Sequence, residues 1–340
     1  MQRSPPREPE RRNPEELSLD GVSGGIEELP KRVDRYGKAK KRSLDVAKYM
    51  ADHEIEQRVA ATVASCGDYL AFRHYFTIDE VRLHGASLCR KHLLCPLCAI
   101  RRGVKALQAY VARWEVIRAE KPALRPFLVT LTVKDGDELD ERFRHLHSSQ
   151  RELWKRKQRG RGSVLAGVAG AVWSYEVKRG AGSGLWHPHL HMIALAEHMT
   201  PEDWREGTLG ALSAEWKSIT GDSHMVNVKP MVSAEPAEDF MEVFKYAVKF
   251  SEQDEADIVH CWRELRGKRL LASAGCFRGV VIPDELDEAL DLPFVTLFYR
   301  YLHGAGYSLQ RRSGYGAAPH VNLPRATCPA IGPPRLPARL

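Results

Sequence analysis

The feature that most constrains the fold is a pair of long apolar segments joined by a short glycine-rich one. VAGAVWSYEVKR (168–179) and HLHMIALA (189–196) flank the segment GAGSG (180–184). Both flanking segments have the composition of β-strands, and the glycines between them suit a turn. The sequence therefore predicts a β-hairpin whose second strand is apolar on both faces and lies in the interior of the protein.

The second strand of this hairpin begins with two histidines at alternate positions. Because side chains alternate across a strand, His189 and His191 project from the same face. Two neighbouring imidazoles can bind one divalent cation, and Glu176 lies across the hairpin where it can pair with this strand end. A carboxylate as third ligand suits Mg²⁺ or Mn²⁺. The alternative is that these histidines are hydrogen-bonded core or edge residues; His187 is expected to face the substrate or support the ligands.

Other segments predict the remaining elements. FLVTLTV (127–133) has the alternation of a strand buried on at least one side, and further short strands are expected in MVNVKP and CFRGVVIP. Periodicity, capping residues and prolines predict helices near the following ranges: 44–64, 99–120, 137–158, 201–219 and 236–251.

Composition limits the class of protein. The 340 residues carry a formal net charge of +7, which favours an acidic partner, with nucleic acid as the first candidate. No apolar run approaches 20 residues and no signal peptide is visible, so a soluble cytoplasmic protein without a membrane partner is expected. Residues 1–43 are predicted to be a disordered basic N-terminal tail, and 311–340 a disordered C-terminal tail.

The cysteines suggest a second metal site. An odd total of seven in a cytosolic chain favours thiols or metal ligands over a disulfide framework. Cys89, Cys95 and Cys98 lie close together in LCRKHLLCPLC, and the Cys-Pro-x-Cys spacing is common as half of a zinc site. Cys66 would complete four thiolates around a structural Zn²⁺, although His84 or His92 could replace it. The alternative is a group of buried free thiols.

A helix predicted over EPAEDFMEVFKYAVKFSEQ carries a candidate nucleophile. Glu242, Tyr246 and Lys249 are spaced i, i+4 and i+7, so they share one helical face. A phenol is a weak nucleophile at its ordinary pKa and needs a neighbouring cation or a metal-polarised target. Lys249 could stabilise the developing charge, and Glu242 could act as a base for water. The alternative is an amphipathic helix in which the tyrosine packs.

These segments together resemble the replication initiator (Rep) proteins of rolling-circle plasmids, in the HUH endonuclease superfamily. FLVTLTV is similar to the first family motif, WHPHLHMIAL to the second and EVFKYAVK to the third. The arrangement of Cys66-Gly67, Cys89 and CPLC resembles the cysteine motif of one plasmid group, and LRGKRLLASAGCFRGV resembles a later segment of that group. The resemblance runs over roughly residues 66–283.

The resemblance implies an α+β fold with an antiparallel central sheet, flanking helices and a small cysteine-rich zinc module. The corresponding domains are a helical and zinc-binding module over 44–122 and a nicking and joining endonuclease domain over 123–310.

The resemblance also implies a reaction and its partners. A divalent ion held by His189, His191 and Glu176 would polarise a phosphate of single-stranded origin DNA, and Tyr246 would attack it. The products would be a 5′-phosphotyrosine and a 3′-OH primer for the host DNA polymerase. Glu242 matches a glutamate that activates water at termination in this group. A double-stranded origin site is also expected, and because no nucleotide-binding phosphate loop is present, unwinding would need a host helicase.

Two alternatives keep part of this pattern. A transposase of the same superfamily would share the order in which the tyrosine follows the histidines. A non-catalytic, zinc-containing copy-control protein would bind DNA without bringing His189, His191 and Tyr246 to one site.

Overall fold

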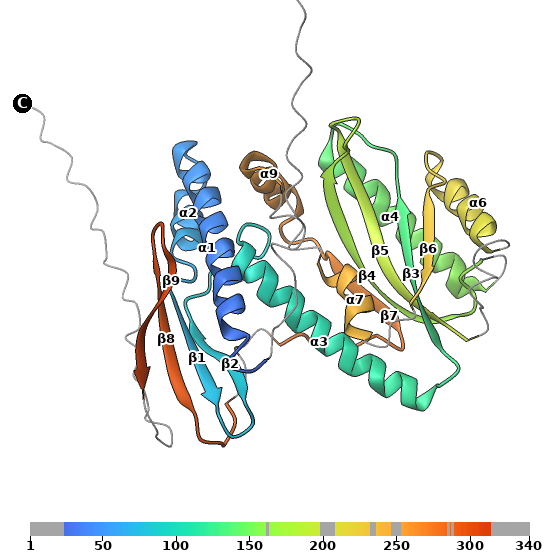
Figure 1. Cartoon of the computed structure of the whole chain (residues 1–340). Helices are drawn as coiled ribbons and strands as arrows, with labels where there is room; N and C mark the ends of the chain where they lie inside the picture. Colours follow the sequence, from blue (N-terminus) through green and yellow to red (C-terminus); the bar gives the residue numbers. More distant parts are fainter. Residues whose placement is uncertain are drawn as a thin grey trace, which may run out of the picture.

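The described part of the chain forms two antiparallel sheets with flanking helices, and its fold is α+β as expected (Figure 1). The computed structural model describes the following residues: 24–160, 163–197, 208–231, 236–245, 253–283, 286 and 289–313. Within these residues, no helix is long and apolar enough to cross a membrane.

The larger sheet has five strands in the order β6-β3-β5-β4-β7. Its strands are β3 (Arg125–Thr132), β4 (Val168–Arg179), β5 (Trp186–Ala196), β6 (Val226–Pro230) and β7 (Leu271–Gly275). Strands β4 and β5 form the predicted hairpin, and their register sets Glu176 directly opposite His189. Strand β5 lies at the centre, where its apolar residues are buried on both faces.

One face of this sheet is covered by helices α4 (Leu139–Arg159) and α6 (Thr208–Thr220). The ring of Trp154 on α4 packs against Trp173 of β4 at a centroid distance of 5.5 Å. The indole N–H of Trp216 on α6 donates to the carbonyl of Thr132 at 2.7 Å. Large aromatic residues therefore fix both helices on this face.

The opposite face carries the histidines and is covered by helix α7 (Pro236–Phe244). Behind α7 lies the long helix α3 (Pro96–Glu120). Tyr110 of α3 stacks on Phe244 at 5.2 Å between ring centroids, and Trp114 stacks on Phe240 at 6.3 Å. Figure 1 shows α3 running from the smaller sheet to the larger one.

The smaller sheet has four strands in the order β2-β1-β8-β9. These are β1 (Tyr69–Tyr75), β2 (Glu80–Ala86), β8 (Val295–Leu302) and β9 (Gly306–Ser313). Helix α1 (Leu29–Asp52) packs on one face, where Tyr36 stacks on Phe72 of β1 at 6.4 Å. The short helix α2 (Gln57–Ala64) packs against α1.

Helix α9 (Glu255–Leu265) contacts elements from both parts of the chain. Glu255 at its start forms an ion pair with Arg42 of α1. Asp257 in its first turn pairs with Arg179 of β4 at 2.9 Å. The side chain of Asp254 caps the helix by accepting from the backbone N–H of Asp257.

The N-terminal region differs from the sequence prediction. Helix α1 begins at Leu29, so the expected disorder is wrong for residues 29–43. The basic run forms an amphipathic helix with one buried face. Val33 and Tyr36 are buried on that face, and the ammonium of Lys40 pairs with Asp68 at 2.8 Å. The single helix expected over 44–64 is two helices, α1 and α2, because the chain breaks at 53–56.

The C-terminal region also corrects the expected boundaries. Strands β8 and β9 (295–313) pair with β1, so residues 295–310 belong to the smaller sheet and not to the 123–310 domain. Strand β9 also extends past the predicted start of the tail at 311, whereas 314–340 lie outside the described residues. No strand forms over 276–283: β7 ends at Gly275, whose backbone is left-handed (φ 63°) and where a Cβ would clash with the carbonyl of Ala169.

Candidate active site and metal centres

Glu176, His189 and His191 meet in the interior of the larger sheet. Nε2 of His189 lies 3.2 Å from one carboxylate oxygen of Glu176, and Nε2 of His191 lies 3.2 Å from the other. All three residues are buried, at 3%, 5% and 8% exposure. One ligand atom from each residue lies within 4.8 Å of the others, which is the separation that a shared cation requires. The sequence prediction that these three side chains converge is confirmed.

The strand register explains how these side chains are held. Glu176 and His189 form a cross-strand pair between β4 and β5, and His191 follows two residues later on the same face. On the other side of β5, His191 pairs with Thr130 of β3, whose hydroxyl hydrogen-bonds to Nδ1 at 3.1 Å. This bond turns Nε2 of His191 toward the carboxylate.

The chemistry of these donors fits a divalent cation. Nε2 of His191 is buried and forms no hydrogen bond among the described residues, although the Glu176 carboxylate is 3.2 Å away. A buried polar atom without a partner is costly, whereas a lone pair directed at a cation would be satisfied. Two imidazoles and a carboxylate are a common ligand set for such an ion.

Of the three residues predicted to share a face of the tyrosine helix, Glu242 is described by the structure, and it lies beside the histidines. Its carboxylate on α7 lies 3.9 Å from Nε2 of His191. The aromatic stacking of Phe240 and Phe244 on α3 holds this helix over the sheet. Tyr246 and Lys249 lie outside the described residues.

His187 lies beside the site and is held by a residue that sequence reasoning missed. Its Nδ1–H donates to Asp135 at 2.5 Å, and its ring centroid is 5.5 Å from that of His189. Desolvation opposes ionisation of Asp135, but hydrogen bonds from Ser183 and His187 outweigh it and lower the pKa of its carboxyl. The only sequence signal for Asp135 was its position just after the strand FLVTLTV.

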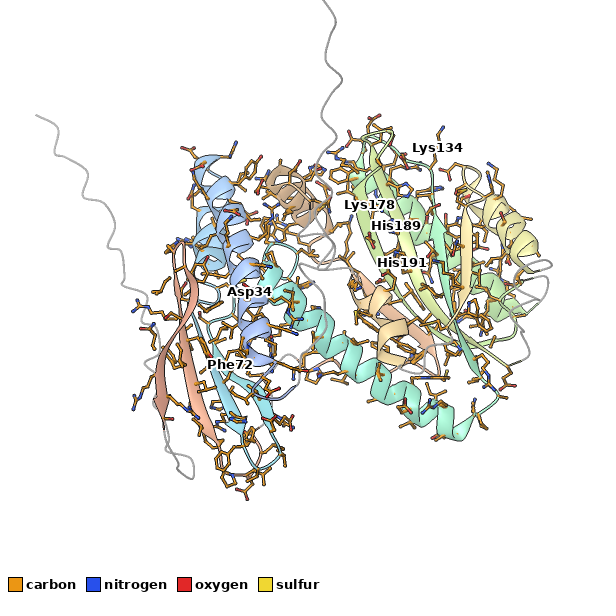
Figure 2. The ribbon with its side chains drawn as sticks, viewed as in Figure 1. Asp34, Phe72, Lys134, Lys178, His189 and His191 are labelled. Carbon is orange, nitrogen blue, oxygen red and sulfur yellow. The ribbon has the colours of Figure 1, made fainter. Side chains whose placement is uncertain are left out.

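Basic side chains surround this end of the sheet. Lys134 and Lys178 are exposed, and Figure 2 labels both near the histidine strand. Arg179 is held more firmly, because it pairs with Asp257 and its guanidinium lies 3.7 Å from the centroid of the Trp186 ring. Positive charge beside a buried cation site suits a phosphate-bearing substrate.

The four predicted cysteines form a second cluster. Cys66 follows α2, Cys89 follows β2, and Cys95 and Cys98 lie at the start of α3. The sulfur of Cys98 is 3.6 Å from those of Cys66 and Cys89, and the sulfurs of Cys66 and Cys95 are 3.5 Å apart. The fourth member is therefore Cys66, and neither His84 nor His92 belongs to the group.

This geometry fits a tetrahedral metal ion. A regular tetrahedron with these edges has its centre about 2.2 Å from each corner, close to the ~2.3 Å of a zinc–thiolate bond. Backbone N–H groups of Cys89 and Lys91 donate to the sulfurs of Cys66 and Cys89, which favours thiolates. Four thiolates this close would repel one another, so a cation must offset their charge.

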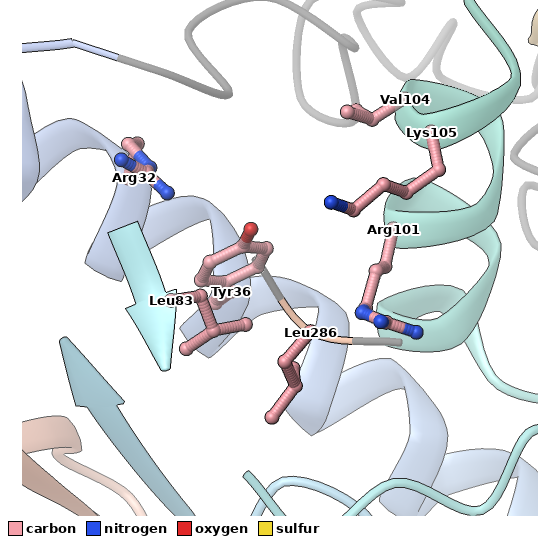
Figure 3. Close-up of a pocket in the computed structure, with 7 residues that line it drawn as sticks. All are labelled: Arg32, Tyr36, Leu83, Arg101, Val104, Lys105 and Leu286. Carbon is pink, nitrogen blue, oxygen red and sulfur yellow. The ribbon is translucent and has the colours of Figure 1, made fainter. Parts of the chain in front are cut away.

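A basic pocket lies a short way along α3 from the cysteine cluster (Figure 3). Arg101 and Lys105 project into it from α3, and Arg32 enters from α1. The remaining lining residues are Tyr36, Leu83, Val104 and Leu286. Among the lining residues that the structure describes, three are cations and none is an acid.

Fold and site together define an α+β protein with a buried centre of two histidines and one carboxylate. The family model of replication proteins matches residues 80–296, more than half of the chain. The chain therefore belongs to the replication protein family, and its resemblance to plasmid replication initiators is confirmed.

Three curated relatives are named "Protein rep". One from Streptococcus pneumoniae is 26% identical, over 70% of this chain and 76% of the relative. One from a Bacillus species is 25% identical, over 51% and 53% of the two chains. One from Lactiplantibacillus plantarum is 27% identical, over 59% and 60%. No solved structure matches the chain with significance.

Proposed function

We propose that this protein initiates rolling-circle replication of a plasmid by nicking one strand of the origin. The observation that carries the proposal is the buried convergence of Glu176, His189 and His191, with Glu242 at 3.9 Å from His191. These side chains would hold Mg²⁺ or Mn²⁺, which supplies Lewis-acid polarisation of the scissile phosphate when bound. Family membership supports the origin as the substrate.

Tyr246 is the proposed nucleophile. Its phenol releases its proton to solvent and the phenolic oxygen attacks the scissile phosphorus, the bond from phosphorus to the 3′ oxygen breaks, and the 3′ oxygen takes up a proton from solvent to become a 3′-OH. The 5′ end remains on the tyrosine as a phosphodiester. Tyr246 lies four residues beyond Glu242, one helical turn if the helix predicted from the sequence continues. Lys249, one turn further, would stabilise the charge that develops on the phosphate.

Glu242 is proposed to act at termination. At that step a water molecule replaces the tyrosine as the attacking group, and a base must accept its proton. The carboxylate of Glu242 is half-exposed beside the histidine pair, so it can contact both solvent and the bound phosphate. His187, positioned by Asp135, would hydrogen-bond to the DNA at the rim of the site.

The cysteine cluster is proposed to bind a structural Zn²⁺. Its sulfurs lie at tetrahedral separations, and two of its members begin α3. The proposed partners are origin DNA, as a duplex binding site and a single-stranded nick site, together with the host helicase and DNA polymerase. Such a protein would act in the cytoplasm.

The test uses a labelled single-stranded oligonucleotide that carries the nick site of the parent plasmid. With Mn²⁺, wild-type protein should give a covalent protein–DNA adduct on a denaturing gel, and Tyr246→Phe should give none. Tyr49→Phe, on helix α1, is the matched control and should behave as wild type. Failure of the wild type to form an adduct, with duplex binding retained, would favour the copy-control protein. Cleavage that persists in Tyr246→Phe would mean that another group is the nucleophile.

A further inference from the structure

We propose that the smaller sheet binds single-stranded DNA on the face that turns away from helix α1, called here the outer face. Its central residues are Tyr69, Arg73, Phe298, Arg300 and Arg311. This inference rests on the proposed function, in which primer extension from the nick releases one strand. It adds a second DNA-binding surface, separate from the histidine site.

Strand register identifies the outer face. Leu70 and Phe72 of β1 point to α1, where Phe72 meets Tyr36, and Figure 1 shows α1 along this side of the sheet. Tyr69 therefore points the other way. Ala71 pairs with Phe298, and Tyr69 pairs with Arg300, so these β8 residues share the outer face.

Two aromatic rings stack on each other at the centre of the outer face. Tyr69 and Phe298 stack with ring centroids 5.6 Å apart and planes inclined by 20°. Beneath them the sheet is made of small residues: a Cβ added at Gly85 would lie 3.3 Å from Cβ of Ala71 and 4.0 Å from the Tyr69 ring. The missing side chain at Gly85 leaves room beside the Tyr69 ring, and both rings remain partly exposed.

Positive charge surrounds these rings. Arg300 and Arg311 are exposed and form no ion pair with any residue that the structure describes. Arg73 lies over the Phe294 ring at 4.2 Å, and its buried Nε has no hydrogen-bond partner in the described ranges. Burial, followed by the charge of Arg73, lowers the pKa of His84 on the neighbouring strand.

Negative charge is limited on the strand residues that the structure describes on this face. Glu80 of β2 is the acid that shares the outer face with Arg82, and the two form an ion pair at 2.8 Å. The charge of Glu80 is thereby offset, so the described strand residues of this face carry a net positive charge. A cationic surface with partly exposed rings is complementary to nucleic acid.

The partly exposed rings favour a single strand over a duplex. Bases in a duplex are stacked on each other and cannot lie on a side chain, whereas unpaired bases stack on aromatic rings. The arginines lie on either side of the ring pair, where they can contact the phosphates of a strand that crosses β1 and β8. A duplex could use only the arginines.

Binding of an oligothymidylate of about 20 nucleotides, longer than a typical site of ~4–16, tests this surface without any origin sequence. The full-length protein is titrated in a fluorescence-anisotropy assay. Tyr69→Leu combined with Phe298→Leu should weaken binding at least fivefold, a value of about 1 kcal/mol for lost stacking. Arg300→Gln combined with Arg311→Gln should reduce the slope of log affinity against log salt by about 1.4.

Arg118→Gln, which removes one positive charge from α3, should leave both quantities unchanged. Melting temperatures identify any variant that fails to fold. For that case, an oligonucleotide with 5-iododeoxyuridine is photocrosslinked to wild-type protein, and the adducts should map to peptides of β1 and β8. Crosslinks confined to the larger sheet would overturn the proposal, and so would wild-type affinity for oligothymidylate in both double variants. It would also be overturned if the double variants changed only the self-association of the protein and not its affinity for the oligonucleotide.

The adduct assay separates this proposal from the proposed function. Oligothymidylate binding through the outer face, in a protein that forms no tyrosine adduct, would support the surface and refute the nicking. Adduct formation by wild type, with oligothymidylate binding indifferent to both double variants, would support the nicking and refute the surface.

Discussion

Loss of the metal from the cysteine cluster should unfold the part of the chain around it. Cys98→Ser removes one of the four sulfurs and leaves three thiols in a buried site. Contact with the thiol of Cys89 raises the pKa of Cys66, whereas burial at Cys95 is outweighed by hydrogen bonds from the neighbouring thiols, which lower the pKa of Cys95, so without a cation the cluster would hold one thiolate among protonated thiols. A cation reverses this, because it binds the deprotonated form.

The expected magnitude is large compared with the stability of a domain. Binding of structural zinc by four thiolates contributes about 10–16 kcal/mol, whereas a folded domain is stable by only about 5–15 kcal/mol. The cluster also joins three separate elements, since Cys66 follows α2, Cys89 follows β2 and Cys98 lies in α3. Loss of the metal should therefore separate α2, β2 and α3.

The consequence should reach the histidine site through helix α3. This helix of 25 residues is roughly 37 Å long, begins at the cluster and supports α7 through Tyr110 and Trp114. Disorder at its start would loosen the helix that carries Glu242 over His191. Nicking should therefore fail in Cys98→Ser even though every residue of the histidine site is unchanged.

Metal content, circular dichroism and limited proteolysis measure these effects. Wild type should contain one zinc per chain, and Cys98→Ser should lose it together with helical signal. Cys276→Ser is the matched control, because Cys276 lies outside the cluster and is half-buried. A chain that is stripped of metal by a chelator and still keeps its helical signal and protease resistance would refute the reasoning.

Four further predictions follow from other sites. Mn²⁺ at about a hundred times its dissociation constant should raise the melting temperature by roughly 5–10 °C, and His191→Ala should abolish this rise. Phe244→Ala should lower the free energy of unfolding, measured by urea denaturation, by about 3–5 kcal/mol, because the Phe244 ring of α7 is fully buried where it stacks on Tyr110 of α3. Arg101→Gln with Lys105→Gln should lower the salt slope of duplex binding by about 1.8. The backbone N–H of Ile26, followed by the imidazole of His74, holds the pKa of Asp79 below its ordinary value, so Asp79→Asn should lower the melting temperature at pH 7, and this difference should disappear as the pH falls through the folded-state pKa.

Specific results would contradict each of these. An equal Mn²⁺ shift in His191→Ala would mean that the ion binds elsewhere. A neutral Phe244→Ala would mean that α7 is not anchored by α3. An unchanged salt slope would remove the basic pocket from the duplex interface. The sign for Asp79 follows from its lowered pKa: its stabilisation is complete above the unfolded value and disappears as the carboxylate is protonated, so a difference that persists in acid would contradict it.

The histidine site could be predicted from the sequence because every part of it is local. Strand alternation alone puts His189 and His191 on one face, and a short turn makes Glu176 their cross-strand neighbour. The four cysteines were predictable for a similar reason, since three of them lie within ten residues. Asp135 was not predictable in this way, because it reaches His187 across 52 positions of sequence.

The smaller sheet could not be predicted because its pairing depends on contacts between the two ends of the chain. Strand β1 pairs with β8, more than 200 residues later, and no periodicity in either segment indicates its partner. The buried basic helix was missed because composition counted Arg32 and Lys40 as solvent-exposed charge. Both are buried: Arg32 donates to the carbonyl of Val81, and Lys40 pairs with Asp68.

The same long-range pairing explains why the two halves of the protein should act together. The strands β8 and β9 that complete the smaller sheet follow α9 in the chain, and α9 is tied by Asp257 to the strand that carries Glu176. A chain ending before β8 would leave Phe72 and its neighbours uncovered at a sheet edge, which is unfavourable for an apolar strand. The histidine site and the outer face therefore depend on the same folded structure. Truncation of the chain before β8 should disrupt both of them more than any single substitution in either one.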